Sequence, residues 1–341
     1  MLKKYFFKIF VFVLILVPSI VLADVFYLEI GNEDAGIVEN IGSGLFGDDF
    51  PSDGHLTMAG RLEYGFSNTP EFIDNLADKV PFFINQDRQA TYFLAQGAYT
   101  PEGSNKSINT VVADDRPYAG YLKFGCRIQS KKNSSNKIVD TLDLTAGLIG
   151  SASLASRVQE AAHSAGGIDS VAGWDNQLNN EPIINIDYER QFRFIHDLAG
   201  SVMTEFAPHI GAGLGNMFTY ISSGFMLRIG SDLDKDYGGP RQNLQLSGLS
   251  FYQPAVSSLF SWNIFTGLEA NAIMRNIFLD GNTFSSSHSV DKENFVIDTV
   301  VGAAITYKNC RIILTLVDRS EEFDLQQDHD SLVKFSISFG I

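Results

Sequence analysis

The sequence lacks the long apolar run that a membrane-spanning helix requires once its first 23 residues are set aside. Such a helix needs about 20 mostly apolar residues, and no stretch after Ala23 approaches that length. The chain also lacks a basic balance, because 25 Lys and Arg residues face 40 Asp and Glu residues, for a formal net charge of −15. Nucleic-acid binding relies on clustered basic residues, so we expect no nucleic acid partner. An acidic surface can still contact anionic lipids if a divalent cation mediates the contact.

The common catalytic signatures are missing as well. The sequence has no Gly-x-Ser-x-Gly elbow, no HExxH pair, no CxxC pair and no phosphate-binding loop. It has only two cysteines, Cys126 and Cys310, and each falls on the apolar face of an alternating segment. We therefore expect two unpaired thiols rather than a disulfide, and we expect any chemistry to use other side chains.

The first 23 residues are typical of a secretory signal peptide. Lysines at positions 3, 4 and 8 precede an apolar run from Ile9 to Val17, and the segment ends on a small residue at Ala23. We expect cleavage after Ala23, which leaves residues 24–341 as the mature domain. Loss of the three lysines takes the formal net charge from −15 to −18. The exported protein is acidic.

Apolar residues in the mature chain alternate with polar or small ones. The alternating apolar positions include Leu142, Leu144, Ala146 and Leu148, then Ile184, Ile186 and Tyr188, then Val333, Phe335, Ile337, Phe339 and Ile341. Alternation with period two is typical of strands that present one apolar and one polar face. In an exported protein with 27 Phe and 12 Tyr residues it favours an all-β transmembrane antiparallel β-barrel, with lipid outside and a polar lumen inside. A soluble β-sandwich would show the same alternation.

We expect about 12 strands, beginning near residues 24–31 and 56–66 and ending at 332–341. A barrel of that size is filled largely by its own side chains, which argues against an open diffusion pore. Polar, turn-rich connections at 40–54, 68–80, 101–115, 231–248 and 281–293 are expected to be loops, the longer ones extracellular.

One segment departs from the strand pattern. Residues 151–165 place Leu154, Val158 and Ala162 on one helical stripe and end at Gly166, which predicts one short helix near the membrane-facing mouth of the barrel. Gln159 and His163 lie one turn apart on this helix, and Asp169 follows past a diglycine. A lone histidine is most often a surface or hydrogen-bonded residue. Here a carboxylate and an amide accompany it, so we consider His163 a candidate base and Asp169 a candidate partner or metal ligand.

Two further polar motifs lie at strand ends. Residues 31–36 read Gly-Asn-Glu-Asp-Ala-Gly, and their oxygen-rich side chains suit a hard cation such as Ca²⁺, although the same residue types also make ordinary turns. Residues 114–120, which contain Asp115 and Arg116, lead into a strand past Pro117. They are consistent either with a rigid strand entry or with a functional role.

Several motifs together resemble one family. They are Asn32-Glu33-Asp34-Ala35-Gly36, Thr57 with Ala59-Gly60, residues 115–120, Gln159-x-x-x-His163, Gly173-Trp174-Asp175-Asn176-Gln177-Leu178 with Glu181-Pro182, and residues 276–284. In order and spacing they resemble the outer-membrane lipid A 3′-O-deacylases, over nearly the whole mature chain.

The resemblance implies a twelve-stranded barrel of the bacterial outer membrane that hydrolyses the 3′-linked acyloxyacyl ester of lipid A with Ca²⁺ as cofactor. Carried over by position, the site residues are Asn32, Thr57, Gln159 and His163, with Glu33 and Asp169 as metal ligands. His163 is then the general base that activates water, and Ca²⁺ polarises the ester carbonyl. The implied partners are lipopolysaccharide and outer membrane lipids, with no obligate protein partner.

The sequence departs from the family pattern at two positions. Glu33 stands where aspartate is usual, and Asp169 stands where glutamate is usual. Each keeps its charge but moves it by one methylene, so the pair can compensate across a shared ion. Two alternative functions remain at the level of sequence. One is an outer-membrane phospholipase that uses the same chemistry, and the other is a non-catalytic barrel that acts as a narrow pore or surface binding protein.

Overall fold

The structure is a computed structural model. It describes residues 24–32, 55–81, 83, 87–102, 109–131, 137–166, 171–240, 248 and 259–340. The expected signal peptide lies outside the described residues, as do the metal-ligand candidates Glu33 and Asp169. For Asn32 the backbone is described, as the last residue of a strand.

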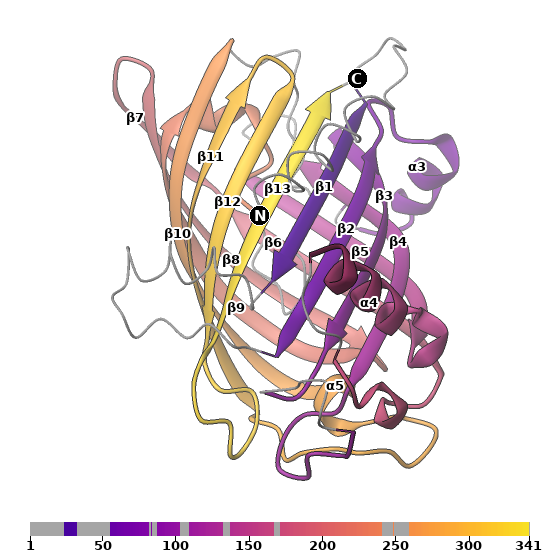
Figure 1. Cartoon of the computed structure of the whole chain (residues 1–341). Coiled ribbons are helices and arrows are strands. Elements are labelled where there is room, and N and C mark those ends of the chain that lie inside the picture. Colours follow the sequence, from indigo (N-terminus) through magenta and orange to yellow (C-terminus); the bar gives the residue numbers. More distant parts are fainter. Residues whose placement is uncertain are drawn as a thin grey trace.

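The described residues form thirteen antiparallel strands that close into a barrel (Figure 1). Their bounds are β1 (Val25–Asn32), β2 (Leu56–Gly65), β3 (Asp87–Tyr99), β4 (Ala119–Lys131), β5 (Ile138–Ile149), β6 (Glu181–Phe192), β7 (Phe194–Ala199), β8 (Val202–Gly215), β9 (Phe218–Ser231), β10 (Phe260–Asn276), β11 (Phe295–Tyr307), β12 (Cys310–Arg319) and β13 (Asp330–Gly340). The expected all-β barrel is confirmed.

The barrel wall has twelve strand positions, because β6 and β7 are two parts of one strand. Both pair with β8: Gln191 of β6 lies opposite His209, and Phe194 of β7 lies opposite Phe206. Only Arg193 separates the two parts along the chain. At the other seam β1 pairs with β13, and this register places Val25 opposite Gly340. Both ends of the described chain therefore lie at one end of the barrel, the terminal end; the opposite end is called the mouth.

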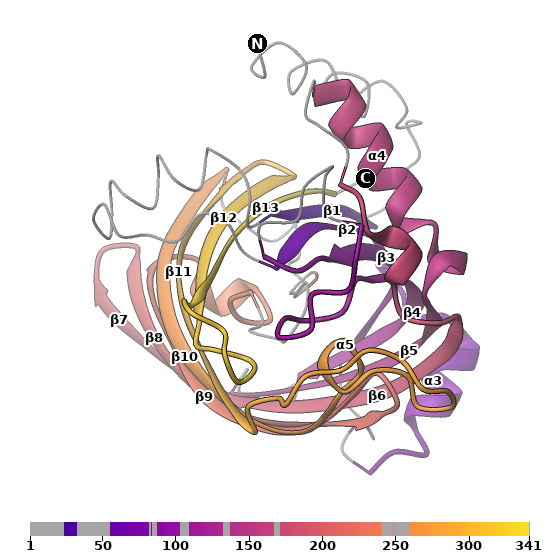
Figure 2. The same ribbon diagram turned by 60° about the horizontal axis from the view of Figure 1, so that its bottom comes forward.

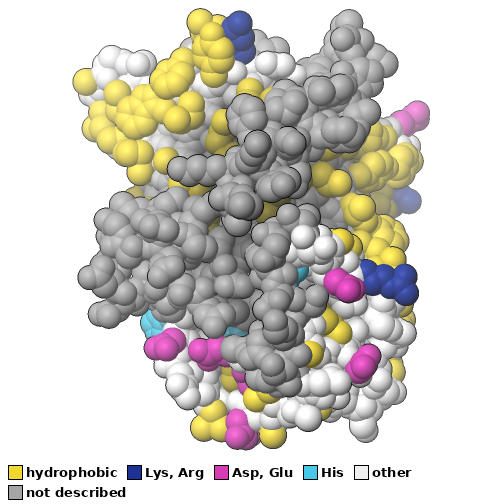
Figure 3. Space-filling view, in the orientation of Figure 1, with side chains coloured by type: hydrophobic (Ala, Val, Ile, Leu, Met, Phe, Trp, Pro, Cys, Tyr) yellow, Lys and Arg dark blue, Asp and Glu magenta, His cyan; other side chains and the backbone are white. Residues whose placement is uncertain are grey.

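Apolar side chains lie on the outer face of the wall, and polar or charged side chains face the lumen. Neighbouring residues in β4 show it, since Phe124 is 59% exposed on the outer face whereas Lys123 is 6% exposed in the lumen. Buried ion pairs fill the lumen, such as the two 2.7 Å hydrogen bonds from Arg127 to Asp143. Figure 3 shows hydrophobic side chains gathered over the upper part of the wall. The expected apolar outer face and polar inner face are confirmed, and both cysteines are free, as predicted.

The described part of the connection after β9 lies in the lumen. It contains the short 3-10 helix η3 (Leu233–Lys235), and Figure 2 shows a coiled segment of its colour inside the ring of strands. Asp236 there accepts hydrogen bonds from Arg193, Arg228 and Arg311, whose guanidinium groups point inward from three parts of the wall. The expectation that longer loops are extracellular is therefore wrong for the described part of 231–248, which begins at the terminal end. Three guanidinium groups inside the lumen make it a favourable place for that carboxylate.

Two helices lie against the outside of the barrel. α3 (Glu71–Ala77) occupies the region expected to be a loop at 68–80, and it packs Ile73 and Ala77 in one cluster with Ala90 and Ile128 of the wall. α4 (Ala155–Gly166) follows the 3-10 helix η1 (Ser151–Ser153), and Figure 2 shows it outside the ring of strands. Within the described part of the chain, no helix has the length and apolarity to cross a membrane.

The orientation of α4 differs from an ordinary amphipathic helix. Leu154 precedes it with a left-handed φ of 59°, and the predicted apolar stripe of Leu154, Val158 and Ala162 is exposed. Gln159 faces the wall and is buried. A helix on the outside of a lipid-facing wall has apolar surroundings on its free side, so its apolar residues point away from the protein.

Candidate active site on the outer wall

A chain of hydrogen bonds joins α4 to the barrel wall. The Trp174 Nε1–H donates to Gln159 Oε1 at 2.8 Å, Gln159 Nε2 donates to Thr57 Oγ1 at 3.0 Å, and Thr57 Oγ1 donates to the Ala98 carbonyl at 3.2 Å. The indole nitrogen is a donor only, so it fixes which end of the Gln159 amide carries oxygen. The side chain of Gln159 is 2% exposed, so these partners stand in for water. The chain therefore fixes both the position and the direction of the amide.

A β-bulge explains why Thr57 meets a helix outside the barrel. In the β2–β3 ladder Leu56 pairs with Tyr99 and Met58 pairs with Ala98, which leaves Thr57 as the extra residue. A bulge bends its strand and re-aims the side chain of the extra residue. The side chain of Thr57 therefore does not follow the inward–outward alternation of β2, and its hydroxyl reaches Gln159.

Contacts along α4 show that the helix crosses the wall strand by strand. A Cβ on Gly120 of β4 would lie only 2.6 Å from Ala155 Cβ, so the start of α4 touches bare backbone there. Just before α4, Gln96 Nε2 of β3 donates to the Ser153 carbonyl at 2.6 Å. One turn into α4, Gln159 reaches Thr57 of β2. The order β4, β3, β2 directs the next turn toward β1.

His163 lies on that next turn. Ala155, Gln159 and His163 are spaced by four residues, so they share the helix face that is turned to the wall. The His163 side chain is half-buried. Asn32 is the last residue of β1, and Gly31 before it pairs with Ala59 of β2, close to Thr57 along the strand. The structure thus brings Thr57 and Gln159 into contact and directs His163 toward the end of β1.

The segment that returns from α4 is anchored by aromatic contacts. Gly173 has a φ of 95°, and a Cβ there would lie 2.5 Å from the Tyr118 ring. The Tyr118 and Trp174 rings meet edge to face with centroids 5.7 Å apart, and Leu178 N–H donates to the Tyr118 carbonyl at 2.9 Å. In the sequence, Trp174 stood out only as part of the Gly173–Leu178 motif, and its role as partner of Gln159 depends on a contact that no local pattern reveals.

An open cavity of about 450 Å³ lies beside this chain of hydrogen bonds. Its lining combines α4 with the return segment: Asn109, Ser156, Gln159, Glu160, Val171, Ala172, Gly173, Trp174 and Asp175. Five of these residues were not singled out from the sequence: Asn109, Ser156, Glu160, Val171 and Ala172. The cavity is large enough for part of a lipid-sized ligand, and most of its polar groups come from one helix and one loop.

A buried histidine ties the loops of the mouth together. His55 precedes β2 and lies 2.9 Å from an Asp330 carboxylate oxygen through Nδ1 and 3.3 Å from Asp115 through Nε2. Burial opposes the charged form, but these two carboxylates raise the pKa of His55 to about 10. Burial also opposes the charged form of Asp115. The hydrogen bond and charge of His55 outweigh that effect, so the pKa of Asp115 is lowered. Asp115 therefore belongs to a structural latch at the mouth, next to the strand that carries Thr57.

Comparison with known proteins agrees with the fold and the ordered motifs. The family described as outer membrane protein LpxR matches residues 14–341. The chain belongs to the LpxR family. The structure of LpxR from Salmonella typhimurium superposes with a TM-score of 0.79 at 24% identity, and the match covers 93% of this chain and 100% of that one. The β domain of the Bordetella autotransporter BrkA matches with a TM-score of 0.45 at 8% identity, over 94% of this chain and 99% of that one. No curated protein sequence matches the chain.

Membership in the LpxR family confirms the predicted family and the predicted location in the outer membrane. The similarity to the Salmonella LpxR structure confirms the twelve-stranded barrel. The roles of the individual site residues remain predictions.

Proposed function

We propose that the protein is a lipid A 3′-O-deacylase, in which His163 activates a water molecule to hydrolyse the 3′-linked acyloxyacyl ester. The observation that carries the proposal is the hydrogen-bonded docking of α4 on the outer wall through Gln159, Thr57 and Trp174. It presents His163 outside the barrel, where a membrane lipid can reach it. Membership in the LpxR family supports the same activity.

In the proposed reaction His163 takes a proton from water as the water oxygen attacks the ester carbonyl. The bond between the acyl carbon and the 3′ oxygen then breaks, and His163 gives the proton to this oxygen, which stays on the sugar as a hydroxyl. The products are a free fatty acid and 3′-deacylated lipid A. Imidazole suits both steps because its ordinary pKa lies close to neutral pH. Gln159 and Thr57 act in this scheme by holding α4, and therefore His163, in place.

The proposed cofactor is Ca²⁺, held by Glu33 and Asp169. The donor set fits this ion, because both side chains are carboxylates and the neighbouring Asn32 adds an amide, and Ca²⁺ prefers oxygen ligands. Asn32 ends β1, and Val171, two residues after Asp169, lines the cavity beside Gln159. When bound, Ca²⁺ would polarise the ester carbonyl and stabilise the oxyanion.

Mass spectrometry of lipid A from cells that express the protein tests the proposal. We expect loss of the mass of the 3′ acyl chains, abolished by His163→Ala and by a chelator, and restored by added Ca²⁺. Ser164→Ala is the matched control, since Ser164 is the exposed neighbour on another face of α4 and should leave the reaction intact. Heat-modifiable migration on gels confirms that each variant is folded.

Three outcomes would contradict the proposal. One is an unchanged lipid A profile with folded, surface-displayed protein. The second is full activity of His163→Ala. The third is release of fatty acid from glycerophospholipid vesicles but not from lipid A, which would identify a phospholipase. The alternative of an open pore finds no support in the described part of the lumen, where Asp236 and three arginines occupy the interior.

A further inference from the structure

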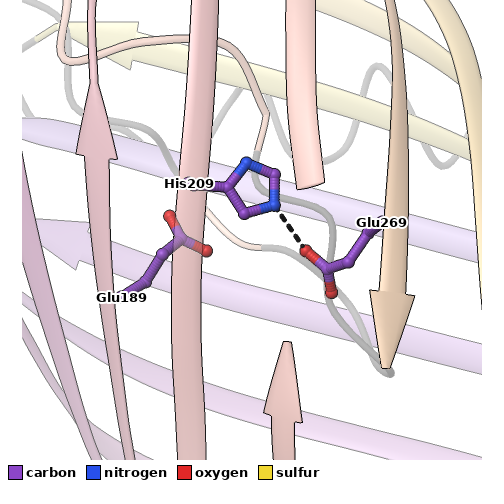
Figure 4. Close-up of side chains that lie close together, drawn as sticks. All are labelled: Glu189, His209 and Glu269. Carbon is purple, nitrogen blue, oxygen red and sulfur yellow. Dashed lines mark hydrogen bonds and ion pairs between the residues drawn. The ribbon is translucent and has the colours of Figure 1, made fainter. Parts of the chain in front are cut away.

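A second group of chemically active side chains lies inside the barrel, apart from the site on the outer wall. Glu189 of β6, His209 of β8 and Glu269 of β10 are buried and converge in the lumen (Figure 4). His209 Nε2 lies 2.9 Å from Glu269 Oε2, and one ligand atom from each residue lies within 4.8 Å of the others. The figure shows the imidazole between the two carboxylates.

Two glycines create the space in which these side chains meet. Gly224 of β9 pairs with His209 on one side and with Glu269 on the other, so it separates the two in the sheet. A Cβ at Gly224 would lie 2.9 Å from His209 Nε2. Gly211 of β8 pairs with Glu189 of the adjacent strand β6. Because Gly224 lacks a side chain, His209 and Glu269 can reach one another across β9, and because Gly211 lacks one, Glu189 meets no side chain at its partner position on β8.

A neighbouring amide supplies a second observation. Asn271 is 1% exposed and lies two residues after Glu269 on β10, so it faces the lumen as well. Neither its Oδ1 nor its Nδ2 has a hydrogen-bond partner among the described residues. Its neighbour in the sheet is Ser222, which in turn pairs with Gly211, next to Glu189. A buried amide without partners is costly, and a ligand for its carbonyl oxygen would remove that cost.

We propose that Glu189, His209 and Glu269 bind one divalent transition-metal ion, Zn²⁺ by preference, with Asn271 Oδ1 as an additional donor. Imidazole nitrogen with carboxylate oxygen suits borderline ions such as Zn²⁺ better than Ca²⁺ or Mg²⁺. Neighbouring ligand atoms around an ion at about 2.1 Å lie roughly 3.0–3.4 Å apart. The 2.9 Å between His209 Nε2 and Glu269 Oε2 is close to the lower end of that range. A dication also balances the two negative charges of the buried carboxylates while the imidazole stays neutral.

The position of the site suggests what the ion does. β6 pairs directly with β8, β9 separates β8 from β10, and β6 ends at Phe192, just before the interruption at Arg193. An ion shared by Glu189, His209 and Glu269 joins these strands across the lumen beside that interruption. It therefore acts as a structural clamp, and it lies on the other side of the wall from His163.

Co²⁺ binding to the purified, full-length barrel in detergent tests the proposal. After chelation and desalting, we expect Co²⁺ to give visible absorption that saturates at one equivalent, that Zn²⁺ displaces and that excess Ca²⁺ does not. His209→Gln and Glu269→Gln should each weaken Co²⁺ binding at least tenfold. His163→Ala is the matched control because it removes the imidazole of the outer site, and it should leave the spectrum unchanged.

Further measurements separate this proposal from the proposed deacylation. His209→Gln should keep its lipid A deacylation in Ca²⁺, so the two activities can fail independently. Zn²⁺ should raise the melting temperature of the wild type but not of His209→Gln. Glu189→Gln provides the same readouts if His209→Gln does not fold. The proposal is wrong if the wild type does not bind Co²⁺ at one equivalent. It is also wrong if binding is unchanged in His209→Gln, Glu269→Gln and Glu189→Gln. Either result would show that His209 and Glu269 are only an ion pair.

Discussion

Thr57→Val tests whether the hydrogen-bonded docking of α4 controls the activity. Valine keeps the branched shape but removes the hydroxyl that accepts from Gln159 Nε2 and donates to the Ala98 carbonyl. Gln159 is 2% exposed, so water cannot readily replace the lost partner. A buried donor without a partner costs about 1–3 kcal/mol. If this cost falls on the docking of α4, the ratio of docked to undocked helix drops about 5- to 150-fold.

The rate of deacylation should fall with the docked fraction, because His163 lies one turn beyond Gln159. The assay is the initial rate at which 3′-deacylated lipid A appears in mixed micelles with Ca²⁺, followed by mass spectrometry. Thr57→Ser is the matched control, since it restores the hydroxyl, and it should stay within about threefold of the wild type. Hydrogen exchange of the α4 amides reports docking directly. If Thr57→Val reacts at the wild-type rate, the reasoning that links Gln159, Thr57 and His163 is wrong.

Three further predictions follow from the same structure. Gly120→Ala should displace α4 and slow deacylation, because its Cβ would lie 2.6 Å from the helix, whereas Gly60→Ala, with nothing within 4 Å, should be silent in the same assay. His55 has a folded pKa of about 10 against an ordinary 6.5, so its contribution to stability is complete below pH 6.5 and is lost as the pH rises through 10; the melting temperature should fall across that window, and less so in His55→Gln. Asp236→Asn removes the charge on which three arginines converge, and we expect new conductance steps in planar bilayers; an unchanged current would show that other contacts hold the segment in the lumen.

The alternation of apolar and polar residues was sufficient to predict the barrel and its two faces, because lipid outside and charge inside impose opposite demands on successive residues. It could not locate the segment around Asp236. A polar connection that enters a charged lumen has the same composition as one that extends into water. The short helix α3 was missed for a related reason, since only Ile73 and Ala77 of its seven residues are buried against the wall.

The residues of the outer site were predictable as a set, but their contacts were not. Gln159 and Thr57 are 102 positions apart, and their hydrogen bond depends on a bulge that no sequence pattern announced. The helix itself was predicted together with its apolar stripe, but the face that contacts the wall was not. The structure shows that Val158 and Ala162 are exposed, whereas the buried position is taken by a glutamine.

The exposed apolar residues on α4 and just before it, together with the filled lumen, restrict how the proposed substrate can reach His163. Asp236 with its arginines, and Gly248, whose N–H donates to Glu29 of β1, occupy the interior, so passage through the barrel is obstructed. The cavity beside Gln159 is instead bounded by α4, whose exposed residues include the apolar Val158, and the apolar Leu154 just before α4 is exposed as well. A molecule with acyl chains can therefore approach along the membrane while its polar part meets the cavity. Access from the bilayer rather than from water would select for a lipid ester, even if His163 itself did not distinguish one ester from another.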